Sequence, residues 1–138
     1  MNSNPKYKDN LIIQLSFDFS LKAIDYAELL EERKKIVISR QFLKSATSIG
    51  ANIREAQNAE SKADFIHKMK IALKECDETE YWLELCENAK NYPKPVGLID
   101  ALSSIRKILN KIVSSSKKSV SVSSSADSLI GLSNNHSK

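Results

Sequence analysis

The chain has 138 residues, of which 41% are hydrophobic and 28% charged, and it contains only three Gly and three Pro. This length and composition indicate one globular domain rich in long helices and exclude a chain that is disordered throughout. The formal net charge of +4 is too small by itself to indicate nucleic-acid binding. Because the sequence shows no signal-peptide pattern and no apolar run of about 18 residues, we expect a cytoplasmic protein without a membrane span.

The first predicted helix carries an unusually broad apolar face. Residues 1–9 are polar and predict a flexible N-terminal arm, after which Asn10 can cap a helix that extends to about Lys35. The apolar side chains of this helix form two rows: Ile13, Phe17, Leu21, Ile24 and Ala27, and beside them Leu15, Phe19, Tyr26 and Leu30. A face this broad is expected of a helix that contacts two neighbours in a bundle and, in addition, another subunit.

Two further helices are predicted in the middle of the chain. Ser39 can cap a second helix that ends near Asn58, and Gly50 within it indicates the close approach of a neighbouring helix. Ser61 and Asp64 resemble a capping box at the start of a third helix, which extends to about Asn91. Its predicted core seam follows the 4-3 repeat of a coiled coil: Phe65, Met69, Ala72, Cys76, Thr79, Leu83 and Cys86.

A proline-containing corner at residues 92–95 separates the third helix from a fourth, predicted from about Val96 to Ser114. Its predicted buried face consists of Leu98, Leu102, Ile105, Leu109 and Ile112. Eleven of the 25 residues from 114 to 138 are Ser, which predicts a disordered tail. Residues 10–113 are therefore expected to form an all-α domain, an antiparallel up-down-up-down four-helix bundle.

The residues that catalysis or metal binding would need are scarce. Cys76 and Cys86 lie ten residues, or about 15 Å, apart on one predicted helix, so we expect buried free thiols rather than a disulfide. No Glu precedes His67 by three residues, which excludes the usual di-iron site of helical bundles, and no Gly-rich phosphate loop is present. We therefore expect no metal, no cofactor and no enzymatic activity.

Several acidic and polar side chains can meet between the second and third predicted helices. A carboxylate pair drawn from Glu55, Glu75 and Glu80 is one interpretation. The interpretation we favour is a structural, hydrogen-bonded cluster of four side chains that fixes the register of the two helices. Its members are Asn52, Glu55, Glu75 and Thr79.

Basic residues are concentrated at one end of the predicted bundle. In an antiparallel arrangement the start of the third helix lies beside the end of the second and the later part of the fourth. Such a cationic end can hold the phosphates of RNA or DNA. The candidate nucleic-acid-binding residues are Arg54, Lys62, Lys68, Lys70, Arg106, Lys107 and Lys111.

The sequence also resembles a known bacterial family. The motif SATSIGANIREA, which ends at Ala56, and the motifs KADFIHKMKIALKE and ETEYWL within residues 62–83 closely resemble the four helix bundle proteins, also called 23S rRNA intervening-sequence or S23 proteins. This resemblance implies a four-helix bundle that assembles as a ring-shaped homopentamer, and it transfers no catalytic residue. A more distant similarity is to the accessory variability protein of diversity-generating retroelements, a basic pentamer that works with a reverse transcriptase and nucleic acid.

Two hypotheses for the function follow. The first is a non-enzymatic oligomeric bundle whose cationic end binds RNA or another nucleic acid. The alternative is a protein-interaction adaptor, a ring that assists a partner enzyme such as a reverse transcriptase without itself contacting nucleic acid.

Overall fold

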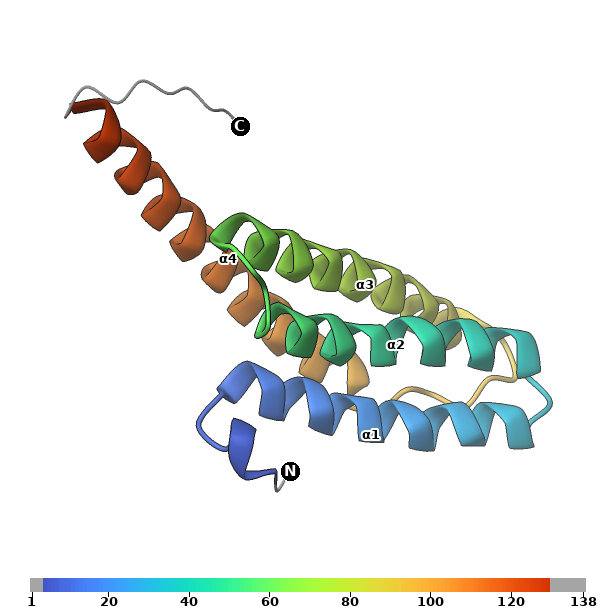
Figure 1. Cartoon of the computed structure of the whole chain (residues 1–138). Coiled ribbons are helices and arrows are strands. Elements are labelled where there is room, and N and C mark those ends of the chain that lie inside the picture. Colours follow the sequence, from blue (N-terminus) through green and yellow to red (C-terminus); the bar gives the residue numbers. More distant parts are fainter. Residues whose placement is uncertain (1–3, 130–138) are drawn as a thin grey trace.

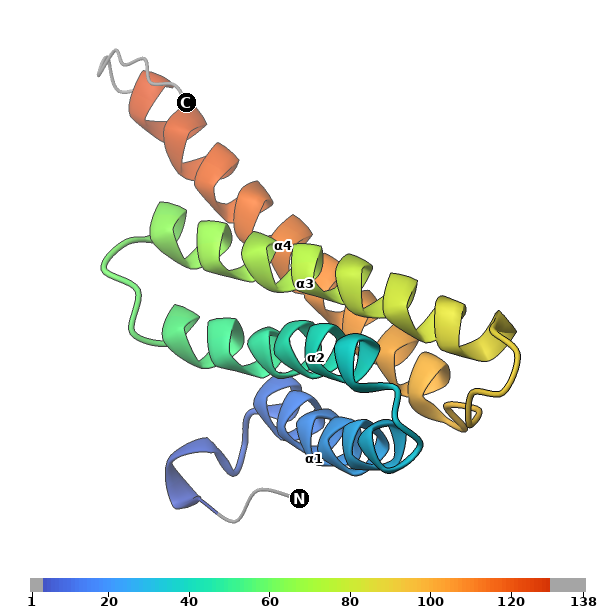
Figure 2. The same cartoon turned by 90° about the vertical axis from the view of Figure 1, so that its right-hand side faces the viewer.

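Four helices pack side by side and run alternately up and down. The computed structural model describes residues 4–129, with side chains described for residues 4–118. A short 3-10 helix, η1 (Pro5–Tyr7), precedes α1 (Leu11–Glu32), α2 (Ile36–Ala56), α3 (Lys62–Asn88) and α4 (Leu98–Leu129), and the described residues form no strand. Each helix packs against the next, and α4 packs back against α1 (Figures 1 and 2). The predicted antiparallel four-helix bundle is thus confirmed.

Two of the three predicted helix caps are present. The Asn10 side chain accepts a hydrogen bond from the backbone N–H of Ile13, and the Ser61 hydroxyl accepts one from the backbone N–H of Asp64. The predicted cap at Ser39 is wrong, because Lys34 adopts a left-handed turn conformation and α2 already begins at Ile36. The buried Ser39 hydroxyl instead donates to the carbonyl oxygen of Ala27 at 2.7 Å and so ties α2 to α1.

The core is organised around α3, as the sequence predicts. Phe65 is partly buried, and the other six residues of the predicted α3 seam are fully buried: Met69, Ala72, Cys76, Thr79, Leu83 and Cys86. Both cysteines are free thiols. Burial disfavours the thiolate and raises the pKa of Cys76 from 9.0 to about 12. The α4 residues Leu98, Leu102, Ile105 and Leu109 complete the core opposite.

Helix α1 is rotated relative to the prediction. Part of its first predicted row points outward, so that Leu21 is 44% exposed and Ile24 is 38% exposed. The core is instead reached through residues such as Phe19 and Ala23. The reason is a close approach of α2 at Gly50, where an added Cβ atom would lie 3.4 Å from the Ser16 hydroxyl oxygen. The close approach predicted at Gly50 is therefore confirmed.

Helix α4 is longer than predicted. It continues past Ser114 to Leu129 and projects beyond the start of α3 (Figures 1 and 2). No Gly or Pro occurs between Gly97 and Gly131, and Ser, although a modest helix former, does not stop a helix. The remainder of the predicted tail, residues 130–138, lies outside the described residues. Over the part of the chain that is described, no helix is both long and apolar enough to cross a membrane.

Candidate nucleic-acid interface

Two neighbouring helix segments are free of acidic residues. On α3 no Asp or Glu occurs from Phe65 to Lys74, and on α4 none occurs from Ala101 to Ala126. Because α3 and α4 pack together in opposite directions, the two segments meet where Lys117 stands beside Lys70, whereas Arg106, near the start of the α4 segment, lies beside Asp77 and Glu80 of α3. The two segments carry six exposed lysines, which we call the cationic corner: Lys70, Lys74, Lys107, Lys111, Lys117 and Lys118.

The cationic corner has no ion pairs within the described residues, although the charge of Lys74 acts on neighbouring Glu75 and opposes the rise of its pKa. None of its six lysines forms one of the ion pairs found there. The ammonium groups of Lys70 on α3 and Lys117 on α4 lie close enough that Lys117 lowers the pKa of Lys70. Two cations from different helices thus face the same solvent region. An anion bound between them would reduce their mutual repulsion.

Four of the seven sequence-predicted residues are exposed lysines. Lys70, Lys107 and Lys111 belong to the cationic corner, and Lys62 is exposed at the start of α3. Lys62 also lines a surface pocket together with Gln57, the residue that follows α2. The other three predicted residues, Arg54, Lys68 and Arg106, have their charged groups engaged by the protein itself.

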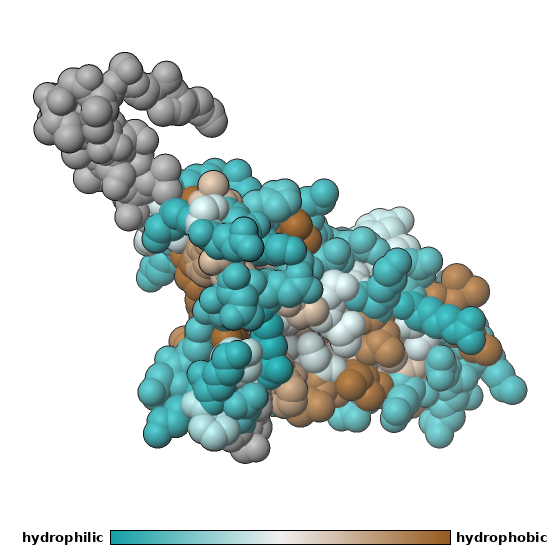
Figure 3. All heavy atoms as spheres, viewed as in Figure 1, coloured by the Kyte–Doolittle hydropathy of each residue, from teal (hydrophilic) through white to brown (hydrophobic). Residues whose placement is uncertain are grey.

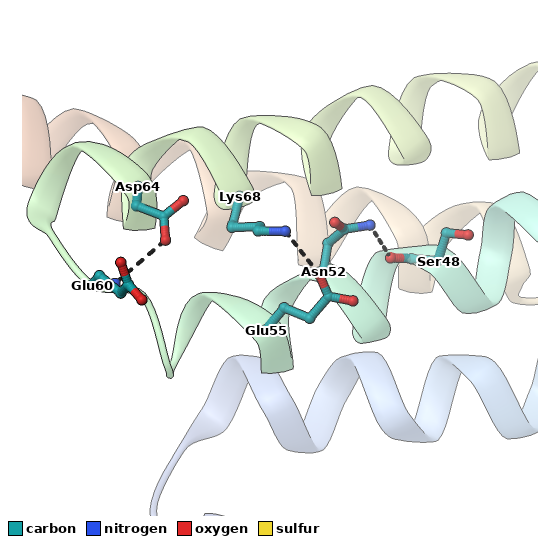
Figure 4. Close-up of polar contacts among 6 residues, drawn as sticks. All are labelled: Ser48, Asn52, Glu55, Glu60, Asp64 and Lys68. Carbon is teal, nitrogen blue, oxygen red and sulfur yellow. Dashed lines mark hydrogen bonds and ion pairs between the residues drawn. The ribbon is translucent and has the colours of Figure 1, made fainter.

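Lys68 is paired across the α2–α3 interface. Its Nζ atom lies 2.9 Å from the Glu55 Oε1 atom, and the hydrogen bond to this carboxylate raises the pKa of Lys68 (Figure 4). Lys68 therefore holds α3 against α2, and its charge is largely compensated.

Arg106 ties α4 to the middle of α3. Its Nη1 atom lies 3.1 Å from Glu80 Oε1 and 3.3 Å from Asp77 Oδ1, and its side chain is only 26% exposed. The Nε and Nη2 atoms of Arg106 are buried and have no hydrogen-bond partner among the described residues. Arg106 is thus a link between helices with compensated charge.

Arg54 lies on the other side of the bundle, toward α1. Its guanidinium group lies 4.7 Å from the ring centre of Tyr7 and 5.4 Å from that of Phe17. Sequence reasoning grouped Arg54 with the lysines because they share one end of the bundle. The structure separates them, because they face different directions.

The four residues of the predicted polar cluster do not form one network. Thr79 donates to the Ser45 hydroxyl, and the Asn52 amide donates to the carbonyl of Ser48 in its own helix. Figure 4 shows the contact of Asn52 with Ser48 and, separately, the contact of Glu55 with Lys68. Glu75 is partly buried, and desolvation, with a further contribution from Glu78, raises its pKa. The prediction of a single cluster is corrected to separate contacts, of which those of Thr79 and Glu55 join α2 to α3 and that of Asn52 lies within α2.

Lys74, Lys117 and Lys118 were missed as candidate binding residues. The last two fell in the predicted tail, where no helix was expected. The absence of Gly and Pro was one available signal, and the spacing of Lys107, Lys111 and Lys118 was another. Residues separated by four and seven positions share one face of an α-helix, so a helix that continues past Ser114 aligns these lysines.

The exposed apolar residues lie away from the cationic corner. A surface pocket of about 310 Å³ lies between α1 and α2, and the exposed side chains of Leu21 and Ile24 follow its lining residues Phe17 and Ser20 by one helical turn; we call this region the α1–α2 face. Figure 3 shows apolar and weakly polar atoms gathered there. The pocket is lined by Ile13, Ser16, Phe17, Ser20, Thr47, Gly50, Ala51 and Arg54.

A second apolar surface lies near the end of α3. Tyr81 is 54% exposed, and Leu85, one helical turn further along, adjoins a pocket of about 380 Å³ that also contacts Ile38 of α2 and Tyr92. We call Tyr81, Leu85 and this pocket the α3 face.

The described residues contain no group of three or more His, Cys, Asp or Glu that could hold a metal ion.

Comparison with known proteins agrees with this fold. The family model described as 23S rRNA-intervening sequence protein matches residues 8–114. A crystal structure of a protein of unknown function from the S23 ribosomal protein family of Bacteroides thetaiotaomicron is 43% identical, with a TM-score of 0.69, over 74% of this chain and 97% of that one. No curated protein matches the sequence. The chain therefore belongs to the 23S rRNA-intervening sequence protein family.

Proposed function

We propose that this family member is a non-enzymatic, cytoplasmic scaffold, a homopentameric ring that binds RNA or another nucleic acid through the cationic corner. The observation that carries the proposal is the group of six exposed lysines without ion-pair partners within the described residues. Phosphates would replace the mobile counterions around these lysines, and the release of those counterions favours binding. Thus the distribution of charge supports nucleic-acid binding although the net charge of the chain is small.

The test is the binding of structured RNA by the full chain at low and at moderate salt. We expect binding at low salt that weakens steeply as the salt concentration rises. The double variant Lys111→Glu/Lys118→Glu is expected to abolish binding. A matched control, Lys34→Glu/Lys90→Glu, changes the net charge equally at exposed sites at the opposite end of the bundle and is expected to bind like the wild type. Absence of binding by the wild type at low salt would refute the proposal.

The two apolar faces support the oligomeric part of the proposal. A closed ring with five subunits needs two different, complementary surfaces on each subunit. The α1–α2 face and the α3 face lie on different helices, and each exposes large apolar side chains. The resemblance of the sequence to pentameric relatives points in the same direction.

Light scattering after size-exclusion chromatography tests this assembly. The wild type is expected to elute as a pentamer, and Leu21→Glu/Ile24→Glu is expected to elute as smaller species, because it places two carboxylates on the α1–α2 face. Leu11→Glu is the control, because Leu11 is an exposed apolar residue of α1 that does not line the pocket between α1 and α2. A monomeric wild type would contradict the proposed ring.

A protein adaptor is the second candidate function. The α3 face favours it, because an apolar pocket beside exposed Tyr81 and Leu85 is suited to a protein partner. This candidate predicts that a partner enzyme, such as a reverse transcriptase, stays bound after nuclease treatment. It also predicts that the purified ring does not shift RNA at low salt, an outcome opposite to that of the first proposal.

A further inference from the structure

The lysines of the cationic corner form two rows on two packed helices. Lys107, Lys111 and Lys118 lie on one face of α4, over a rise of about 16 Å. Lys70 and Lys74 lie one turn apart on α3, and Lys117 stands beside Lys70 at the junction of the two helices. Packed helices have axes about 8–10 Å apart, so the rows are separated but able to contact one ligand together.

The polar groups between the two lysine rows are short hydrogen-bond donors. Ser103, Asn110 and Ser114 are exposed on the same side of α4. Hydroxyl and amide groups of this kind are among the side chains that contact phosphates and sugars. The corner can therefore contact a nucleic-acid backbone along most of its surface.

Aromatic side chains are nearly absent from the corner. The side chains of residues 62–74 and 98–118 are all described, and they include a single aromatic ring of Phe, Tyr or Trp. This ring belongs to Phe65, which is half-buried. Exposed Tyr81 lies further along α3 among Asp77, Glu78 and Glu84, whose charges repel phosphates. Proteins that hold single strands without sequence preference stack the bases on exposed aromatic rings. The corner lacks this means of binding unpaired bases.

We infer that the cationic corner binds the paired phosphate backbones of a double-helical nucleic acid in preference to a single strand. A duplex presents two rows of phosphates at a fixed separation on either side of a groove, which two rigid rows of lysines can contact together. Because α3 and α4 are continuous helices over the corner, each row of lysines is held on a rigid helix without an ordering step on binding. This inference rests on the proposed nucleic-acid binding and specifies its substrate class.

The experiment measures the affinity of the full chain for three fluorescent probes of equal length at one salt concentration. The probes are an unstructured single-stranded RNA, an RNA duplex and a DNA duplex. We expect at least one duplex to bind about tenfold or more tightly than the single strand, because only duplexes engage both rows. Equal affinity for the two duplexes would show recognition of phosphates alone, and preference for RNA would show an added contribution from its 2′-hydroxyls; both outcomes support the inference.

A variant that removes one of the two lysine rows sharpens the test. Lys70→Gln/Lys74→Gln removes the α3 row and is expected to bring duplex affinity close to the single-strand value. Lys34→Gln/Lys90→Gln, the control with the same charge change, is expected to preserve the preference. Circular dichroism confirms that each variant is folded.

The possible failures of the two proposals are distinguishable. A single strand that binds at least as tightly as both duplexes would overturn the duplex inference and leave the proposed function standing. If no probe binds at low salt, the proposed function fails and the inference fails with it.

Discussion

Thr79 on α3 donates a hydrogen bond to the hydroxyl oxygen of Ser45 on α2 across 2.8 Å, and the two residues are 0% and 1% exposed. The Ser45 hydroxyl in turn donates to the carbonyl oxygen of Phe42 in its own helix at 3.1 Å. This chain of two hydrogen bonds fixes the α2–α3 register in an otherwise apolar region, since its donors have no alternative water partner.

Removing the acceptor of the hydrogen bond between Thr79 and Ser45 should lower the free energy of unfolding more than removing its donor. In Ser45→Ala the buried hydroxyl of Thr79 loses its acceptor, and we expect a loss of about 1–3 kcal/mol in the free energy of unfolding. Thr79→Val removes the hydroxyl but keeps its shape and leaves Ser45 bonded to Phe42, so we expect a loss of at most about 1 kcal/mol. Urea unfolding measures both values.

The double variant Ser45→Ala/Thr79→Val provides the control. Its stability is expected to resemble that of Thr79→Val more than the sum of the two losses, because no buried hydroxyl is then left unpaired. Additive losses would contradict a coupled pair.

Arg106 offers a contrasting case, in which the ion pairs contribute little stability. The Nε and Nη2 atoms are buried without partners, which offsets the benefit of the contacts with Asp77 and Glu80. We expect Arg106→Met to lie within about 1 kcal/mol of the wild type, because the apolar side chain keeps the packing without the orphaned donors. Asp77→Ala/Glu80→Ala, which leaves the half-buried guanidinium without a partner, should be the less stable variant in thermal unfolding. The reverse order would show that the ion pairs stabilise the α3–α4 interface.

Gly50 allows α1 and α2 to pack closely, but glycine is not the residue that gives this position the greatest stability. An added Cβ would meet Ser16 atoms at 3.4–3.6 Å, which is tight but ordinary contact, while Ala favours a helix over Gly by about 1 kcal/mol. We therefore expect Gly50→Ala to raise the melting temperature by a few degrees or leave it unchanged. Gly50→Leu should lower it markedly, because the larger side chain cannot fit between α1 and α2. A marked destabilisation by Gly50→Ala would mean that the helices cannot adjust at all.

The sequence predicted the fold well wherever one apolar row dominates a helix. On α3 the 4-3 seam has no competing row, and its members from Met69 to Cys86 are all buried. On α1 two apolar rows compete, and periodicity cannot decide which one faces the bundle. The choice is made by small residues, such as Ser16 against Gly50 and Ala23 in the core, which carry little hydrophobic signal of their own.

The candidate site was harder to predict because a free charge is defined by what lies across an interface. Lys68 and Lys70 are two residues apart, yet one contacts Glu55 on α2 and the other stands beside Lys117 on α4. The two lysines differ in the neighbouring helix that each one faces, and this depends on the rotation of α3 about its own axis. Sequence reasoning found the region and three of the six lysines of the cationic corner, whereas the choice among the charged residues required the packed structure.

The buried ionisable groups predict a loss of stability at alkaline pH. Burial raises the pKa of Cys76 from 9.0 to about 12 in the folded protein, so the folded state retains a proton that the unfolded chain releases above pH 9. The free energy of unfolding should therefore fall between about pH 9 and pH 12, by up to about 1.4 kcal/mol per pH unit for this group. Burial also raises the pKa values of Cys86 and Tyr26, which add to the fall with the same sign.

Urea unfolding at a series of pH values from 8 to 11 measures this slope. Cys76→Ala removes the Cys76 thiol from the titration, so its stability should fall less steeply above pH 9 than that of the wild type, whatever its stability at pH 8. Cys86→Ala is the matched variant, because Cys86 lies on the same seam and the pKa of its thiol is also raised by burial, with the Tyr26 hydroxyl opposing the shift. It should therefore show a smaller change in slope than Cys76→Ala. Identical slopes for the wild type and Cys76→Ala would show that the Cys76 environment admits the thiolate, and would contradict its place in a closed core.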